Sequence, residues 1–334
     1  TSTAMNRPVM RIVKHDQYGG FEELSLRESP RPEPAADQVR VRIVAVGLHV
    51  GDCFGVRGAP LPMRFVSGLF GPKVGIPGFD FAGIVDAVGD EVEGYGVGDE
   101  VFGTNEHAGA AAEFICVRPR DLARKHPELS FEAAAVLPTS GLAALHALRD
   151  VAKLRAGQRV LINGASGGVG HFAVQLAKHY GAHVTGVCST RNVEMVRSIG
   201  ADEVVDYTRE DFTTAGKRYD LIFDNVENRE LADIRRALEP KGVLIVNSGT
   251  GAEGFAMFVR MVKPLLLSPF VSQDLKRYLS MPNPDDLQLL GDLAARGELK
   301  PVLDRGFALE DTADALGYIE QGHVSGKVYL SLAR

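Results

Sequence analysis

The chain has 334 residues, enough for about two domains, and its 45% hydrophobic and 24% charged residues are ordinary for a globular protein. The formal net charge of -6 gives no general attraction for nucleic acids or anionic membranes, so we expect neither as a partner. Three cysteines are too few and too scattered for a disulfide framework, which favours a reducing compartment, the cytoplasm by default.

Two stretches are excluded as targeting or membrane segments. Residues 1–4 have neither an apolar nor an Arg-rich targeting pattern, and we leave them out of the fold prediction. The most apolar stretch, residues 255–271, is interrupted by charges and prolines and therefore does not predict a membrane span.

The N-terminal part, up to about residue 117, shows short runs of alternating polar and apolar residues separated by glycine and proline. This pattern predicts β-strands at residues 38–46, 81–88, 100–102 and 112–117. Several short strands with turn residues between them indicate a small barrel-like β domain.

The pattern changes after Ser130, which is a good N-cap for the small helix-forming residues that follow it. From about residue 132, helical segments alternate with apolar runs, and we expect strands at residues 159–164, 183–189, 203–206, 219–225 and 242–247. This order is typical of an α/β fold with a doubly wound parallel sheet, in which ligands bind at the carboxyl ends of the strands.

Residues 159–171 predict a strand, a tight turn and the start of a helix, with glycines at positions 164, 167 and 170. Glycine lets the backbone turn sharply and approach a pyrophosphate, whose charge then lies against the free N–H groups of the helix N-terminus. We expect Ser166, Gly167, Gly168 and Val169 to form this phosphate cradle. A structural glycine-rich turn is the alternative, and the second strand at the spacing of a βαβ unit favours dinucleotide binding.

The next strand ends in Cys188-Ser-Thr-Arg191, and this ending bears on the choice of cofactor. A carboxylate there would hold the ribose 2′-hydroxyl of NAD, whereas a 2′-phosphate needs donors and a cation. Ser189, Thr190 and Arg191 therefore favour NADPH, with a solvated arginine as the alternative. Tyr207, after the third strand, is a candidate contact on the adenosine side or a turn residue.

The C-terminal part predicts a run at residues 274–280, a helix at about 285–295 and a last strand at 326–332. This strand comes after the α/β region is complete. We infer that it returns to the N-terminal domain, so that two stretches of chain make one domain.

Several ordered motifs together resemble the medium-chain dehydrogenase/reductase superfamily, and within it the zinc-independent quinone oxidoreductase and enone reductase branch. They are Gly78-Phe-Asp-Phe-Ala-Gly-Ile-Val-Asp-Ala-Val-Gly89, Gly98-Asp-Glu-Val-Phe-Gly103, Asn163-Gly-Ala-Ser-Gly-Gly-Val-Gly170, Cys188-Ser-Thr-Arg-Asn192, Gly200-Ala-Asp202 and Gly326-Lys-Val328. The resemblance implies a GroES-like catalytic domain (residues 5–131 and 283–334) interrupted by a Rossmann NADP-binding domain (residues 132–282). It also implies a homodimer, for which residues 275–279 are our candidate contact.

Zinc-dependent members of that superfamily bind a catalytic zinc at positions that match His49, Phe79 and about Thr139 here. Only His49 can be a ligand, and a catalytic zinc needs three, so we expect no metal. Without a Lewis acid to stabilise an alkoxide, hydride addition to a quinone or to the β-carbon of an enone becomes the favoured reaction.

The resemblance also carries over further candidate site residues. His49 and Asp52 are the catalytic candidates, with His49 titrating near neutral pH as a donor to the substrate or the nicotinamide; a structural histidine beside Asp52 is the alternative. Asn247 and Ser248 follow the fifth strand, where the fold places nicotinamide, and Lys327 is a candidate phosphate or cleft contact.

The chain departs from the branch at three positions. His49-Val-Gly-Asp52 replaces the usual Asn-Pro-x-Asp, Ala143 stands where a threonine often contacts the nicotinamide, and Glu227 replaces a common glycine without a functional explanation.

We therefore expect an NADPH-dependent reductase of small quinones or α,β-unsaturated carbonyl compounds. The alternatives are an alcohol or ketone oxidoreductase of the same fold, and an NADPH-binding structural or regulatory protein without turnover.

Overall fold

The computed structural model describes residues 8–247 and 254–332, which form two compact units. Unit 1 contains the chain up to Thr139, Pro282–Arg296 and the chain from Leu303, and unit 2 contains Ser140–Met281 and Gly297–Val302. Unit 2 thus begins later than residue 132, and a short segment after residue 296 rejoins it, which the sequence did not indicate.

Unit 1 is built mainly from β-strands. Its strands are β1 (Val9–Lys14), β2 (Ser25–Pro30), β3 (Val39–Leu48), β4 (Asp80–Val88), β5 (Glu100–Thr104), β6 (Phe114–Val117), β7 (Leu122–Arg124), β14 (Leu303–Ala308) and β15 (Lys327–Ser331). Its helices are α1 (Val50–Arg57), α2 (Arg64–Ser67), α3 (Phe131–Ala135), α9 (Pro284–Ala295) and α10 (Thr312–Glu320).

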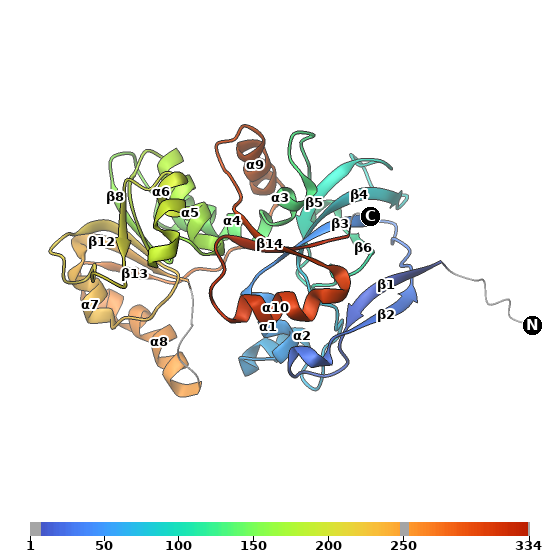
Figure 1. Ribbon diagram of the computed structural model, residues 1–334, viewed down its shortest axis with the longest axis horizontal. Helices are drawn as coiled ribbons and strands as arrows, with labels where there is room; N and C mark the ends of the chain where they lie inside the picture. Colours follow the sequence, from blue (N-terminus) through green and yellow to red (C-terminus); the bar gives the residue numbers. More distant parts are fainter. Residues whose placement is uncertain (1–7, 248–253, 333–334) are drawn as a thin grey trace, which may run out of the picture. The chain divides into compact units, whose positions relative to one another are not determined.

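The main sheet of unit 1 has the strand order β14-β15-β3-β4-β5-β7, with β6 also paired to β3. The C-terminal strand β15 runs antiparallel to β3 and pairs Val328 with Leu48, so the end of the chain completes the sheet that the N-terminal part begins. Figure 1 shows these strands, from blue to cyan and then red, side by side.

Strand β3 lies at the centre of this sheet because both of its edges are paired and its apolar residues form the core. Val39, Val41 and Ile43 are buried. Gly47 is required near its end, since a Cβ there would lie 2.2 Å from the carbonyl oxygen of Ala135 in α3. This close packing fixes the point at which the chain leaves the sheet and enters α1.

Unit 2 is an α/β domain. Its strands are β8 (Arg159–Asn163), β9 (His183–Cys188), β10 (Glu203–Asp206), β11 (Tyr219–Asp224), β12 (Leu238–Val246) and β13 (Asp274–Lys276). Its helices are α5 (Gly168–His179), α6 (Val193–Ser198), α7 (Leu231–Arg236) and α8 (Gly254–Leu267), preceded by α4 (Pro138–Leu145) and the π-helical η4 (His146–Val151).

All neighbours in the order β10-β9-β8-β11-β12-β13 are parallel, which confirms the predicted doubly wound sheet. Strand β8 is buried from Val160 to Asn163, as expected for a parallel strand covered on both faces. The chain order reverses at β8, so the ligand site of such a fold is expected where β8 and β11 end. No helix among the described residues has both the length and the apolar character needed to cross a bilayer.

Candidate functional site

The turn between β8 and α5 in unit 2 depends on its glycines. Gly164 has a φ of 76°, and a Cβ on Gly170 would lie 1.9 Å from the carbonyl oxygen of Gly164. Gly167 is the N-cap of α5, and no side chain caps that helix end. The turn therefore has no room for a side chain at Gly170, and binding of a phosphate by Ser166, Gly168 and Val169 stays a prediction.

Asn192 connects this turn to the end of β9. Its side-chain amide donates to the Ser166 hydroxyl at 3.2 Å and to the Ser189 hydroxyl at 3.3 Å, and the residue is buried. Sequence reasoning missed Asn192, although its place beside Arg191 in the Cys188–Asn192 motif was a usable signal. The structure thus brings Ser166 and Ser189 together through a residue that was not predicted.

A carboxylate lies at the end of β9, although the sequence predicted none there. The Thr190 hydroxyl donates to the Asp206 carboxylate at 2.5 Å, and this carboxylate also accepts from Thr208 at 2.7 Å. The sequence indicated no acidic group here, but β9 and β10 are parallel neighbours and end at the same edge. Arg191 is exposed, and Tyr207 is 54% exposed.

Polar side chains meet where β8, β11 and β12 end. The buried Asp224 carboxylate accepts from the Asn163 amide at 2.9 Å and from the backbone N–H groups of Val226 and Glu227. The Asn247 amide donates to Asn225 at 2.8 Å, so Asn247 lies at this edge as predicted. Ser248 lies outside the described residues.

Glu227 has a structural explanation that the sequence did not provide. It is buried with a φ of 55°, a conformation that is uncommon for a residue with a side chain. Both terminal nitrogens of Arg277 donate to its carboxylate, and Arg277 Nε donates to the Met261 carbonyl oxygen in α8 at 3.1 Å. The Glu227–Arg277 pair thus ties the loop after β11 to α8.

In unit 1, His49 is the N-cap of α1. Its Nδ1 accepts the N–H of Gly51 at 3.0 Å, and its own backbone N–H donates to Asp52 at 2.9 Å, which together form a capping box. Because Nδ1 is an acceptor, the neutral ring has its proton on Nε2. Nε2 is buried and has no hydrogen-bond partner among the described residues; it lies 4.0 Å from the Asp52 carboxylate.

Two strand ends and helix α1 bring charged groups to this histidine. Asp80 begins β4, opposite Gly47 of β3, and Lys327 begins β15, next to the Val328–Leu48 pair. Asp80 accepts from the Thr139 backbone N–H at 2.9 Å and from its hydroxyl at 2.6 Å. Asp52 accepts from the Gly78 N–H at 3.0 Å, and all three charged side chains are buried.

Burial sets the protonation states in this cluster. Burial is the main reason that the pKa of His49 is lowered to about 4. The charge of Asp80 raises this pKa, and the charge of Lys327 lowers it. Burial likewise raises the pKa of Asp52 to about 6, against hydrogen bonds from two backbone N–H groups and the charge of Lys327. The prediction that His49 titrates near neutral pH is therefore wrong, because a buried imidazole beside an ammonium group stays neutral there.

Lys327, the candidate phosphate or cleft contact, begins β15. Its side chain is fully buried in unit 1, where burial lowers its pKa while Asp80 and Asp52 raise it. Burial of Lys327 near Asp80 and Asp52 favours the cleft contact over the phosphate contact, and both stay predictions.

The positions that match zinc ligands in zinc-dependent relatives also lie together. The rings of His49 and Phe79 are stacked, with centroids 5.4 Å apart, and Thr139 binds Asp80, the residue after Phe79. His49 therefore contacts an aromatic ring where a second ligand would stand.

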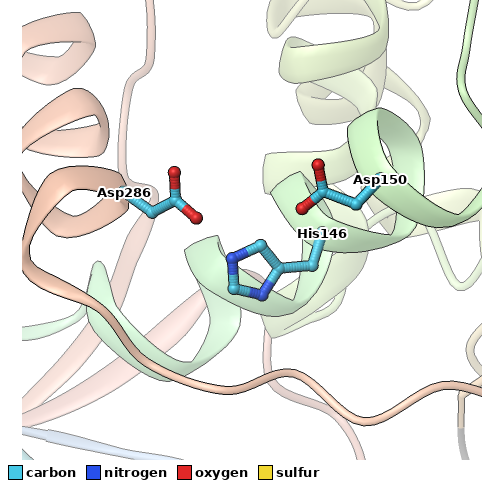
Figure 2. A group of neighbouring side chains, drawn as sticks. All are labelled: His146, Asp150 and Asp286. Atoms are coloured by element: carbon cyan, nitrogen blue, oxygen red, sulfur yellow. The ribbon is translucent and has the colours of Figure 1, made fainter.

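Figure 2 shows another set of potential metal ligands, His146 and Asp150 on η4 and Asp286 near the start of α9. Asp286 belongs to unit 1, where the Asn283 amide donates to its carboxylate at 2.8 Å. His146 and Asp150 belong to unit 2. We treat them as two separate groups, neither of which offers the three ligands that a zinc site needs.

Comparison with known proteins gives consistent matches. The family model described as an alcohol dehydrogenase GroES-like domain matches residues 35–128, and the one described as a zinc-binding dehydrogenase matches residues 199–330. A chloroplast envelope quinone oxidoreductase homolog of Arabidopsis thaliana is 31% identical over 96% of this chain and 98% of its own length.

Two further relatives agree with these matches. A chloroplastic NADPH-dependent alkenal/one oxidoreductase of Arabidopsis thaliana is 32% identical over 96% of this chain and 78% of its own length. The solved structure of the quinone oxidoreductase from Coxiella burnetii has a TM-score of 0.84 and 29% identity, covering 98% of this chain and 100% of that one.

Proposed function

Because the chain belongs to the quinone oxidoreductase branch of the medium-chain dehydrogenase/reductase superfamily, we propose that it reduces quinones or α,β-unsaturated carbonyl compounds with NADPH and without zinc. The chain is an oxidoreductase with a nicotinamide dinucleotide-binding fold. The observation that carries the proposal is the buried Nε2–H of His49, a neutral donor without a partner among the described residues.

The residues at the carboxyl edge of the unit 2 sheet fit a dinucleotide. The backbone of Gly167, Gly168 and Val169 would hold the diphosphate, and Tyr207 and Asn247 would contact the adenosine and nicotinamide ends. Ser166 would support the turn through Asn192, and Ser248 remains a sequence-based candidate. When bound, the reduced nicotinamide supplies the hydride.

The choice of NADPH over NADH is supported by Arg191. Its exposed guanidinium follows Ser189 at the end of β9, where a 2′-phosphate would need a cation and a donor. Asp206 opposes this choice, because its carboxylate already accepts the Thr190 hydroxyl and would repel a phosphate. We propose NADPH as the preferred cofactor because the Arg191 guanidinium carries a permanent charge and several N–H donors, and because one relative is named NADPH-dependent.

His49 would act as a hydrogen-bond donor to the acceptor's carbonyl oxygen. Hydride addition to a quinone or an enone places negative charge on that oxygen, and a fixed donor in a dry site stabilises it. The low pKa of His49 keeps Nε2–H on a neutral ring, so the residue holds the oxygen and does not deliver a proton as an imidazolium. Asp52 positions His49 by accepting its backbone N–H.

We propose a reaction without zinc because too few zinc ligands stand at the matching positions. The positions that match zinc ligands hold His49, Phe79 and Thr139, which supply one nitrogen ligand where three protein ligands are needed. Burial lowers the pKa of Lys327, while the charges of Asp80 and Asp52 raise it. Metal analysis of the purified protein should give far less than one zinc per chain, and activity that survives a strong chelator would agree.

The experiment that tests the reaction follows absorbance at the reduced-nicotinamide band with quinones, enones and saturated ketones, using NADPH and NADH in parallel. We expect oxidation of NADPH with quinones or enones and little with saturated ketones. Turnover of ketones alone, or tight NADPH binding without turnover of any acceptor, would contradict the proposal.

We also propose a homodimer formed through strand β13. Within residues 8–247 and 254–332, this strand pairs with β12 on one side only, and the exposed Leu279 and Met281 lie just beyond it. Light scattering should give twice the chain mass, and Leu279→Lys should shift the measured mass toward that of the monomer.

We propose a cytoplasmic location, which the three free thiols favour. The names of both plant relatives described above refer to the chloroplast. A fluorescent fusion of the protein is the direct test of its location.

A further inference from the structure

Unit 1 contains a cavity of about 300 Å³ to which the proposed function assigns no role. It is lined by α1, by the chain from Pro72 to Pro77 before β4, and by the turn after β5. Pockets for small molecules start at about this volume. An apolar cavity of about 150 Å³ is enough for benzene, so this one has room for a group about twice as large.

The lining of the cavity is mainly apolar. Val56, Val74, Ile76 and Phe79 contribute side chains, and Val56 is completely buried. Of the polar lining residues, Lys73 and the ion pair of Glu106 with His107 are exposed. The cavity therefore suits a hydrocarbon body, with polar groups at its exposed side and the buried side chains of His15 and Asp52 as further polar lining.

Two lining residues connect the cavity directly to His49. Phe79 lines the cavity and stacks on the His49 ring, with centroids 5.4 Å apart. Asp52 also lines it and accepts the His49 backbone N–H at 2.9 Å. The cavity and the His49 ring thus share Phe79 and Asp52 as neighbours.

The segment before this lining is also apolar and exposed. Leu61, Phe65 and Phe70 are 68%, 78% and 98% exposed, and Ser67 within this segment lines the cavity. The surface next to the cavity is therefore compatible with apolar molecules.

We propose that this cavity binds the apolar body of the electron acceptor, which selects fused two-ring quinones or long-chain enones over one-ring or short-chain ones. This inference rests on the proposed function, because it names the class of acceptor that the enzyme prefers. Adding or removing a single methylene in an apolar pocket changes kcat/KM by about tenfold or more, so a second ring is enough for clear selectivity.

Gly55 provides a way to fill the cavity without disturbing the fold. It lies in α1 and lines the cavity, and a Cβ added to it would meet no atom within 4 Å. Leucine also has a better helix propensity than glycine, so Gly55→Leu should fold. Gly96 is a matched control in the same unit, because it has equally open space and does not line the cavity.

The kinetic test compares 1,4-naphthoquinone with 1,4-benzoquinone. For Gly55→Leu we expect the ratio of their kcat/KM values to fall at least tenfold relative to the wild type, whereas Gly96→Leu should leave the ratio unchanged. An unchanged ratio in Gly55→Leu would overturn the proposal. Val74→Trp, which enlarges a side chain in the Pro72–Pro77 lining segment, should lower the same ratio.

A binding test separates this proposal from the proposed function. Saturation-transfer NMR with 2-naphthol, which accepts no hydride, needs no turnover. We expect transfer to 2-naphthol in the wild type and in Gly96→Leu, and its loss in Gly55→Leu, even if no quinone or enone were reduced. No transfer in the wild type, or equal transfer in all three proteins, would overturn the cavity assignment.

Discussion

His49 combines two tasks on the two nitrogens of one ring. Nδ1 caps α1 by accepting the Gly51 N–H, and Nε2–H is left as a donor. An alanine substitution would remove both and could not tell a structural role from a catalytic one. Two substitutions that keep a capping oxygen can separate them.

His49→Ser should keep the cap but is too short to donate to the acceptor. We expect kcat to fall about 100-fold, the usual effect of losing one oxyanion donor, with stability changed by less than about 1 kcal/mol. His49→Asn keeps both a cap and an N–H donor and should retain within about tenfold of wild-type kcat. Equal activity of the two variants would show that Nε2–H is not the donor.

Arg191 and Asp206 should have opposite effects on cofactor choice. Losing a hydrogen bond to a charged group costs about 1.5–3 kcal/mol, so Arg191→Ala should raise the KM for NADPH about tenfold or more and change that for NADH little. Asp206→Asn removes the carboxylate that accepts the Thr190 hydroxyl and should lower the KM for NADPH. Initial rates with both cofactors measure these effects, and equal effects on NADPH and NADH would rule out the 2′-phosphate role.

The backbone geometry of the turn before α5 depends on Gly170. A Cβ there would lie 1.9 Å from the Gly164 carbonyl oxygen, whereas a Cβ on Gly167 would lie at an ordinary 3.4 Å. Gly170→Ala should therefore destabilise the protein by about 1–3 kcal/mol, as overpacking does, and Gly167→Ala should not. Urea denaturation compares the two, and matching midpoints would mean that the turn adapts.

Most strands of unit 2 were predictable from the sequence because each is a short apolar run between turn residues. The strand predicted at residues 203–206 has those bounds as β10. Strand β12 begins at Leu238, earlier than the predicted residue 242, because Leu238 pairs with Tyr219 before a register shift. Local propensity does not predict such a pairing across strands.

The contacts between side chains were less predictable for the same reason. Asp206 reaches Thr190 because β9 and β10 end together, and Lys327 reaches the His49 cluster because β15 pairs with β3. The sequence identified Thr190, Lys327 and His49 as separate candidates. Their neighbours depend on strand order and register, which a motif does not contain.

Unit 1 is assembled from both ends of the chain, so its buried charges bear on the stability of the folded protein. The His49 pKa falls from an ordinary 6.5 to about 4 on folding. Between these values the unfolded chain binds a proton that the folded protein does not, so this residue makes stability rise with pH. Asp52, with its pKa raised to about 6, has the opposite effect over an overlapping range.

The His49 contribution can be isolated by comparing the wild type with His49→Asn, since Asp52 is common to both. On acidification from pH 7 to pH 5, the wild type should lose about 2 kcal/mol more stability than the variant, at about 1.4 kcal/mol for each pH unit below 6.5. Urea denaturation followed by circular dichroism at both pH values measures the difference. A parallel loss in the two proteins would mean that His49 titrates normally in the folded state, and its Nε2–H would then not be held as a neutral donor.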